Sequence, residues 1–265
     1  MASGMPNTQV QPMHDLFLFA GQSNMAGRGI TSARWPQPAP ALLPGAGSEY
    51  RAISAPDRLF PIAEPFGAAE NHPDGIYEPG MKTGSLVTAF VNAWYQNTGV
   101  PVIGVSASKG GSEIALWQGK SDLLSDALAR FAKAEDYLHA QQIPVRHRFL
   151  VWCQGETDGD LATEPETYQA RFRTLWAQCR AAGMETCFLI AIGQYNGVKG
   201  YDYTAIHDAQ LELPRQEPGV VLVSDAFCTM RARGLMKDSY HYYQQAYDEV
   251  GTEAGTAAAR WLCRR

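Results

Sequence analysis

The sequence has no excess of positive charge and no cysteine framework. Its 265 residues carry 22 Lys and Arg against 27 Asp and Glu, which argues against nucleic acid and anionic membranes as partners. The five cysteines are dispersed without a C-x-x-C pair, so no disulfide framework is expected. None of the six histidines stands at metal-ligand spacing from another histidine or a cysteine. We therefore expect no metal and no other cofactor.

A signal peptide is also missing from the beginning of the sequence. MASGMPNTQVQPMH has no basic region followed by a long apolar stretch, and the apolar run 16–20 is too short to serve as a signal or to span a membrane. We expect a cytoplasmic protein from the sequence as it stands, or a secreted one if a native signal has been removed. Residues 1–13 are expected to form a loose arm. The sequence does not indicate an oligomeric state.

Apolar runs that alternate with amphipathic stretches indicate the fold class. With 45% hydrophobic and 18% charged residues, the chain is suited to one α/β domain spanning residues 1–265. Short apolar runs separated by helices predict a parallel sheet of about five strands with helices on both faces. The expected strands are 15–20, 101–106, 147–153, 186–193 and 220–224. Segment 28–81, with nine prolines, is expected to be a long ordered loop insertion near the site.

The stretch DLFLFAGQSNMAG, residues 15–27, carries the first candidate for chemistry. A buried strand ends at Gly21 and passes into a polar turn, which would place Ser23 over the edge of the sheet. A serine there is either the N-cap of a helix or a nucleophile whose own backbone N–H also faces the ligand. Ligands bind beyond the carboxyl ends of parallel strands, which favours the second interpretation if a base lies nearby.

The segment Asp238-Ser239-Tyr240-His241 supplies a candidate base. An aspartate three residues before a histidine can accept a hydrogen bond from Nδ1 and leave Nε2 to take a proton from a serine. The alternative is an unrelated surface pair at the start of the last helix. Together, Ser23, His241 and Asp238 make a candidate catalytic triad.

Two further loops after strands could stabilise an oxyanion. In KGGS, residues 109–112, glycine N–H groups can face a ligand, and in QGETD, residues 154–158, the amide of Gln154 can donate. Glu156 and Asp158 are interpreted mainly as anchors of this loop. Cys153 is a rival nucleophile, but the run VWC is more typical of a core. No G-x-S-x-G motif is present, so the pattern is not that of an ordinary α/β-hydrolase.

With these four blocks in order, the chain resembles the SGNH (GDSL-like) hydrolases, and within them carbohydrate esterase family six and the sialate O-acetylesterase (SASA) domain. The resemblance rests on GQSNM, on GGS followed by a tryptophan at 117, on QGETD and on the Asp238/His241 pair. It implies a three-layer α/β/α, flavodoxin-like fold and a serine esterase that removes O-acetyl groups from sugars. Cys153, where many relatives have histidine, and Asp-Ser-Tyr-His in place of Asp-Gly-x-His leave the substrate open.

The resemblance also implies residue roles. Ser23 would be the nucleophile, His241 the base and Asp238 its orienting partner. The oxyanion donors would be the Ser23 N–H, a glycine N–H (Gly111, or alternatively Gly110) and the Gln154 side chain. Substrate contacts are expected from Gln22, Asn24, Gly110 and Glu156. The expected partner is an acetylated carbohydrate such as acetylated xylan or O-acetyl sialic acid. The alternatives are an aryl or short-chain lipid esterase and an inactive sugar-binding module.

Overall fold

The computed structural model describes residues 12–265, so most of the predicted N-terminal arm, residues 1–11, lies outside the described residues. Seven strands form one sheet in the order β3-β2-β4-β1-β5-β6-β7. All neighbouring pairs are parallel except β2 and β3, which are antiparallel. The strands are β1 (His14–Gly21), β2 (Gly47–Arg51), β3 (Ala55–Pro61), β4 (Val102–Ser108), β5 (Val145–Cys153), β6 (Thr186–Ile190) and β7 (Val220–Ser224).

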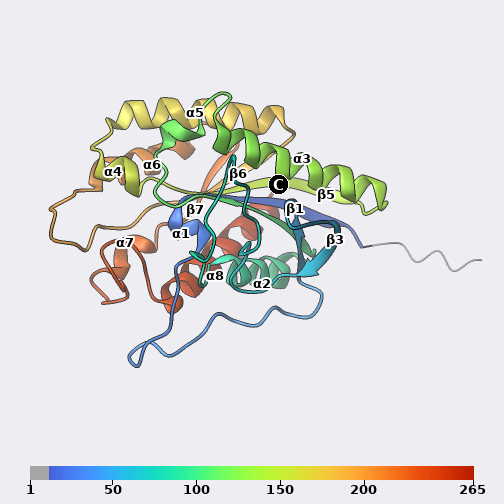
Figure 1. The fold of residues 1–265 in the computed structure, drawn as a ribbon, viewed down its shortest axis with the longest axis horizontal. Coiled ribbons are helices and arrows are strands. Elements are labelled where there is room, and N and C mark those ends of the chain that lie inside the picture. Colours follow the sequence, from blue (N-terminus) through green and yellow to red (C-terminus); the bar gives the residue numbers. More distant parts are fainter. Residues whose placement is uncertain (1–11) are drawn as a thin grey trace, which may run out of the picture.

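Helices cover both faces of this sheet, as predicted (Figure 1). Alternate residues of a strand point to opposite faces, and β1 follows this rule. Phe17 and Phe19 pack with α2 and α8, whereas Leu16, Leu18 and Ala20 pack with α3, α5 and α6. The helices are α1 (Ser23–Ala26), α2 (Val87–Thr98), α3 (Asp122–Ala140), α4 (Glu156–Asp160), α5 (Pro165–Ala181), α6 (Thr204–Gln216), α7 (Phe227–Met230) and α8 (Gln244–Leu262), with a 3₁₀ turn at Ile114–Trp117.

The expected strand number was too low, because two strands come from the proline-rich segment that was expected to be a loop. β2 and β3 extend the sheet at the side of β4. Their sequences, GSEYR and APDRLFP, lack the apolar runs of the central strands, since an edge hairpin exposes much of its surface and tolerates proline. No helix in the described part of the chain is long and apolar enough to cross a membrane.

The docking of α8 fixes the segment that precedes it, which contains His241. Gly251 and Gly255 of α8 lie against α2 so closely that an added Cβ would be 2.3 Å from the carbonyl oxygens of Leu86 and Phe90, respectively. The absence of side chains at these two positions therefore lets the helices approach. Because α8 begins only three residues after His241, this contact holds the histidine over the sheet edge.

Candidate active site

The turn after β1 places Ser23 at the beginning of α1. Gly21 has φ +141°, and a Cβ there would lie 2.0 Å from the Cys153 carbonyl oxygen, so only glycine allows the ends of β1 and β5 to approach this closely. The Gln22 N–H donates to that same oxygen at 2.9 Å. Gln22, not Ser23, is the N-cap residue. The alternative interpretation of Ser23 as a helix cap is therefore wrong.

Ser23, His241 and Asp238 lie within hydrogen-bonding distance of one another. The Nε2 atom of His241 is 3.0 Å from the Ser23 Oγ, although 218 positions separate the two residues. On the other side of the ring, Nδ1 lies 3.1 and 3.0 Å from the two carboxylate oxygens of Asp238. This geometry leaves the hydroxyl facing a ring nitrogen while a carboxylate orients the imidazole.

The surroundings of this pair lower both pKa values. Burial raises the pKa of Asp238, but the backbone N–H groups of Tyr240 and His241, together with Lys237, donate to the carboxylate and hold the pKa below its usual range. For His241, burial lowers the pKa and outweighs the opposing effect of Asp238, and the positive charge of Lys237 acts in the same direction as burial. The carboxylate therefore stays ionised, and the imidazole is neutral at neutral pH.

A pocket of about 400 Å³ opens in front of Ser23 and His241. Gly110 and Gly111 line it, but their backbone N–H groups differ. The Gly110 N–H donates to Glu78 Oε1 at 2.7 Å. Within the described residues nothing accepts the N–H of Gly111 or of Ser23. Gly111, with φ +65°, is therefore the glycine whose N–H remains available to a ligand.

Gln154 does not contribute to this pocket. Its side chain is fully buried, and its amide nitrogen donates to the Ser112 carbonyl at 3.0 Å and to Asp158 Oδ2 at 2.6 Å. Since an amide has two N–H donors, both are already used. The expected oxyanion role of Gln154 does not fit this arrangement, in which the amide ties the loop after β5 to the loop after β4.

Asn24 also lies behind the pocket and not in it. The side chain is completely buried; its nitrogen donates to Glu156 and to the Tyr240 carbonyl, and its oxygen accepts from the Tyr247 hydroxyl at 2.6 Å. Gln22 does line the pocket, and its oxygen accepts from the backbone N–H groups after β5. Asn24 therefore connects α1, α4 and the segment before α8, a role other than the expected substrate contact.

Two acidic residues of the QGETD loop have different surroundings. Asp158 accepts from the Ile114 N–H at 2.8 Å and from Gln154, which agrees with the anchoring role predicted for it. Glu156 lines the pocket, and in the described structure its Oε2 atom is buried without a partner. Burial raises the pKa of Glu156 to about 7, against the hydrogen bond from Asn24, which lowers it. Cys153, the rival nucleophile, is fully buried, and burial raises the pKa of its thiol.

Sequence reasoning missed a buried ion pair in the wall of the pocket. Arg28 Nη2 contacts Glu78 Oε1 at 2.7 Å, with the two side chains 8% and 5% exposed. The other carboxylate oxygen of Glu78 is buried and has no partner among the described residues. No spacing signal links these two residues, which are 50 positions apart. The same Glu78 oxygen also accepts from the Gly110 N–H, so the ion pair lies beside the polar turn that the sequence had already singled out.

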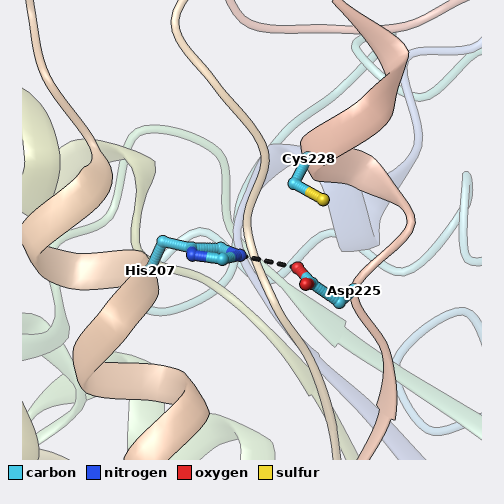
Figure 2. A group of neighbouring side chains, drawn as sticks. All are labelled: His207, Asp225 and Cys228. Atoms are coloured by element: carbon cyan, nitrogen blue, oxygen red, sulfur yellow. Dashed lines mark hydrogen bonds and ion pairs between the residues drawn. The ribbon is translucent and has the colours of Figure 1, made fainter.

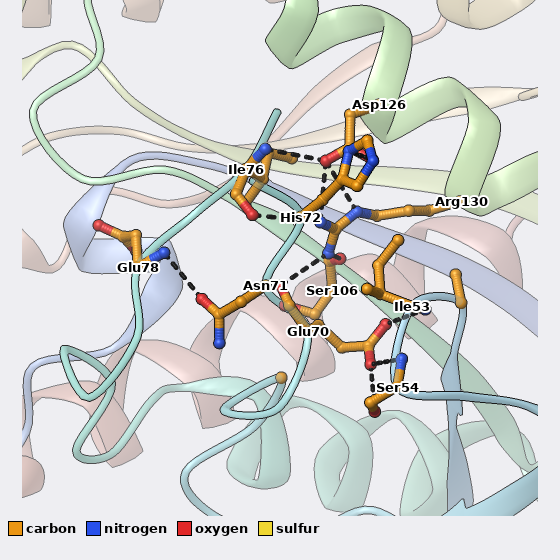
Figure 3. Close-up of polar contacts among 12 residues, drawn as sticks. Ile53, Ser54, Glu70, Asn71, His72, Ile76, Glu78, Ser106, Asp126 and Arg130 are labelled. Carbon is orange, nitrogen blue, oxygen red and sulfur yellow. Dashed lines mark hydrogen bonds and ion pairs between the residues drawn. The ribbon is translucent and has the colours of Figure 1, made fainter. Parts of the chain in front are cut away.

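A network around Arg130 holds the segment that carries Glu78 (Figure 3). Arg130, which is 1% exposed, donates to Asp126 and to the carbonyl oxygens of Glu70 and Ile76. Asp126 in turn accepts from the Ile76 N–H at 2.9 Å. Asn71 at the end of this network accepts from the Glu78 N–H at 2.8 Å. These hydrogen bonds attach the proline-rich segment to α3, and this attachment holds Glu78 in the wall of the pocket.

One group of possible metal ligands occurs in the described residues, away from this pocket. His207, Asp225 and Cys228 bring three candidate ligand atoms within 4.8 Å of one another (Figure 2). The spacing rules applied to the sequence could not find it, because the histidine is 18 positions from the aspartate and 21 from the cysteine.

Comparisons with known proteins agree with the fold and the predicted family. A family model described as carbohydrate esterase, sialic acid-specific acetylesterase (SASA) matches residues 13–260. A protein from Arabidopsis thaliana superposes with a TM-score of 0.71 at 21% identity, covering 94% of this chain and 99% of that one. A carbohydrate acetylesterase from Xanthomonas citri superposes with a TM-score of 0.60 at 17% identity, covering 95% of this chain and 57% of the other.

No curated protein matches the sequence. The family match nevertheless extends over nearly the whole described chain and includes all four sequence blocks. The chain therefore belongs to the SASA family of carbohydrate esterases and is a carboxylic ester hydrolase.

Proposed function

We propose that this esterase removes O-acetyl groups from carbohydrates through an acetyl-enzyme intermediate formed on Ser23. The single observation that carries the proposal is the 3.0 Å contact between Ser23 Oγ and His241 Nε2, with Asp238 on the other ring nitrogen. Nucleophilic catalysis by serine requires this contact between the hydroxyl and a ring nitrogen whose other side is oriented by a carboxylate.

The chemistry would proceed in two halves. Ser23 Oγ attacks the acetyl carbonyl while His241 takes its proton; as the bond from the carbonyl carbon to the sugar oxygen breaks, the same proton passes to that oxygen and the sugar leaves with a free hydroxyl. Water then attacks the acetyl-serine while His241 takes its proton, and that proton returns to Ser23 Oγ as the acyl bond breaks and acetate leaves. The developing oxyanion would be bound by the N–H groups of Ser23 and Gly111, each such donor typically being worth about 10²–10³ in rate. The ester bond is cleaved with His241 as the only proton carrier.

The lining of the pocket favours a hydroxyl-rich substrate over a lipid. Arg28, Glu78, Lys109 and Asp160 all line it, and charged side chains of this kind can exchange hydrogen bonds with sugar hydroxyls. Tyr77, from the proline-rich segment, is 49% exposed at its rim and can stack on a sugar ring. A long acyl chain would bury these charges without compensation.

A substrate series tests this proposal. Acetate release is measured from acetylated xylo-oligosaccharides, from O-acetyl sialic acid and from p-nitrophenyl esters of increasing acyl length, with Ser23→Ala as the blank. We expect acetylated sugars to be hydrolysed and the p-nitrophenyl series to fall steeply beyond acetyl. Preference for longer acyl chains would support the lipid esterase instead, and binding of sugars without turnover of any ester would support the inactive module.

A further inference from the structure

A second cluster of reactive side chains lies at the carboxyl end of β7, outside the pocket of Ser23. His207 comes from the first turns of α6, Asp225 follows β7 directly, and Cys228 lies three residues later in α7. Figure 2 shows the three side chains turned toward a common point. The Nε2 atom of His207 is 2.6 Å from Asp225 Oδ1, and the three ligand atoms all lie within 4.8 Å.

We propose that these residues form a binding site for a divalent transition-metal ion of the zinc class. Imidazole nitrogen, carboxylate oxygen and thiolate sulfur are the three donor types that Zn²⁺ uses in proteins. A neutral imidazole with one carboxylate and one thiolate supplies two negative charges, which balance the charge of the ion. Hard cations such as Mg²⁺ and Ca²⁺ prefer oxygen ligands only, so the thiol sets the class of metal.

The side chains need only a small movement to bind such an ion. Tetrahedral bonds of about 2.0 Å to nitrogen and oxygen place those two atoms about 3.3 Å apart, against the present 2.6 Å. The direct His207–Asp225 hydrogen bond therefore opens by less than about 1 Å to admit the metal. All three side chains are partly exposed, so neither the rotation nor the entry of the ion requires the core to open.

The surroundings fit an open coordination site. His207 and Cys228 line a pocket of about 310 Å³ together with Tyr203 and Arg231, which leaves room for a water molecule as fourth ligand. On the other side of the ring, Asp208 lies 3.6 Å from His207 Nδ1. That is where an outer carboxylate orients a metal-bound imidazole. This pocket shares no lining residue with that of Ser23, so the ion would lie outside the pocket in which ester cleavage is proposed.

Two other parts of the chain supply matched controls. His147 Nδ1 contacts Glu185 Oε2 at 2.8 Å, a histidine–carboxylate pair that belongs to no third-ligand cluster in the described residues. Cys263 is a free, exposed thiol and likewise belongs to no such cluster. Adventitious metal binding to imidazole or thiol alone would affect these positions at least as much as the proposed site.

Cobalt titration tests the proposal on the full chain without an affinity tag, after dialysis against a chelator. We expect one equivalent of Co²⁺ to give a thiolate-to-cobalt charge-transfer band and the visible bands of a tetrahedral site, both abolished by one equivalent of Zn²⁺. His207→Ala and Cys228→Ser should each weaken binding by at least about tenfold. Cys263→Ser and His147→Gln should leave it unchanged. Absence of the charge-transfer band, or its loss in Cys263→Ser, would overturn the proposal.

Alkylation of the unmodified protein gives an answer even if the variants fold poorly. The rate at which iodoacetamide modifies each cysteine is followed by mass spectrometry with and without Zn²⁺. We expect Zn²⁺ to slow modification of Cys228 by at least about tenfold, because a metal-bound thiolate is shielded, and to leave Cys263 unaffected in the same molecule. Equal rates at Cys228 in the presence and absence of the metal would contradict the site.

Discussion

Two histidine–aspartate pairs at the carboxyl edge of the sheet, His241–Asp238 and His207–Asp225, present the imidazole in opposite ways. In the Ser23 pocket, Asp238 contacts Nδ1 of His241 and leaves Nε2 for the serine. In the second cluster, Asp225 contacts Nε2 of His207 itself. The same two side-chain types therefore leave a ring nitrogen free to accept a proton from Ser23 in the first pair. In the second pair, the imidazole and the carboxylate converge with the Cys228 thiol on one point.

This difference shows that residue composition alone does not assign a function to a histidine pair. What decides is which ring nitrogen the carboxylate contacts and what lies at the opposite nitrogen. A hydroxyl opposite the carboxylate, as at Ser23, is the arrangement from which we propose a general base. A thiol beside the carboxylate, as at Cys228, gives a set of converging ligands. The exposed pair His147–Glu185 has neither neighbour and is therefore a reference for both.

The largest expected effect comes from removing the hydroxyl that distinguishes the first pair. Ser23→Ala should lower kcat for acetyl ester hydrolysis by about 10⁴–10⁶, because the covalent route is lost. The side chain is only 7% exposed, but its loss creates little empty space beside an open pocket, so the melting temperature should change little. A fluorophosphonate should label Ser23 alone in the wild type, as shown by peptide mass mapping. Substantial labelling or turnover in Ser23→Ala would place the nucleophile elsewhere.

The next largest effect compares the carboxylates of two histidine pairs, Asp238 beside His241 and Glu185 beside His147. Asp238→Asn should lower kcat by about 10²–10⁴, because the amide no longer fixes the ring orientation or stabilises the imidazolium. Glu185→Gln should change kcat by less than about twofold, since its partner His147 lies on no reaction path. Steady-state kinetics of both variants on one acetylated substrate measures the contrast. Equal losses would mean that these substitutions act through the fold and not through the base.

A third test concerns the buried carboxylate of Glu156. Burial raises the pKa of Glu156 to about 7 from 4.5, so the folded state holds a proton that the unfolded state loses. This contribution to the free energy of unfolding is present below pH 4.5 and is lost as the pH rises through 7. The shift corresponds to roughly 3 kcal/mol. Denaturant unfolding at about pH 4.5 and above about pH 7 should show this loss in the wild type and not in Glu156→Gln, whose amide can still accept from Asn24. A parallel pH dependence in both proteins would mean that another group titrates.

The parts of the site that sequence reasoning found are those where the chain itself forms the local geometry. Gly21 ends a buried strand and Ser23 follows it, and Asp238 stands three residues before His241, so each half of the proposed triad can be found within a few residues of sequence. Their meeting follows from the rule that ligands gather beyond the carboxyl ends of parallel strands. The alternation of apolar runs and amphipathic stretches likewise predicted the two helical layers and the central strands.

What sequence reasoning could not supply depends on contacts between segments. Gln154 follows a strand, as an oxyanion donor would, but its neighbours Ser112 and Asp158 occupy both its N–H groups. Arg28 and Glu78 pair across 50 residues of a segment whose two strands, β2 and β3, carry no apolar run. His207 and Cys228 come from different elements at no recognised spacing. In each case the deciding partner is fixed by packing and not by local sequence.

The smallest expected effect concerns the positive charge beside His241. The proposed mechanism requires neutral His241, and burial together with Lys237 lowers the pKa of this histidine below 6.5. The acid limb of kcat/KM should therefore have its midpoint below pH 6.5. Lys237→Met removes a positive charge that disfavours the imidazolium, so the limb should move to higher pH by less than about one unit, or about 1.4 kcal/mol. Lys199→Met, which removes a charge from another loop, should leave the limb in place. A limb above pH 6.5, or a downward shift in Lys237→Met, would show that a group other than His241 controls the rate.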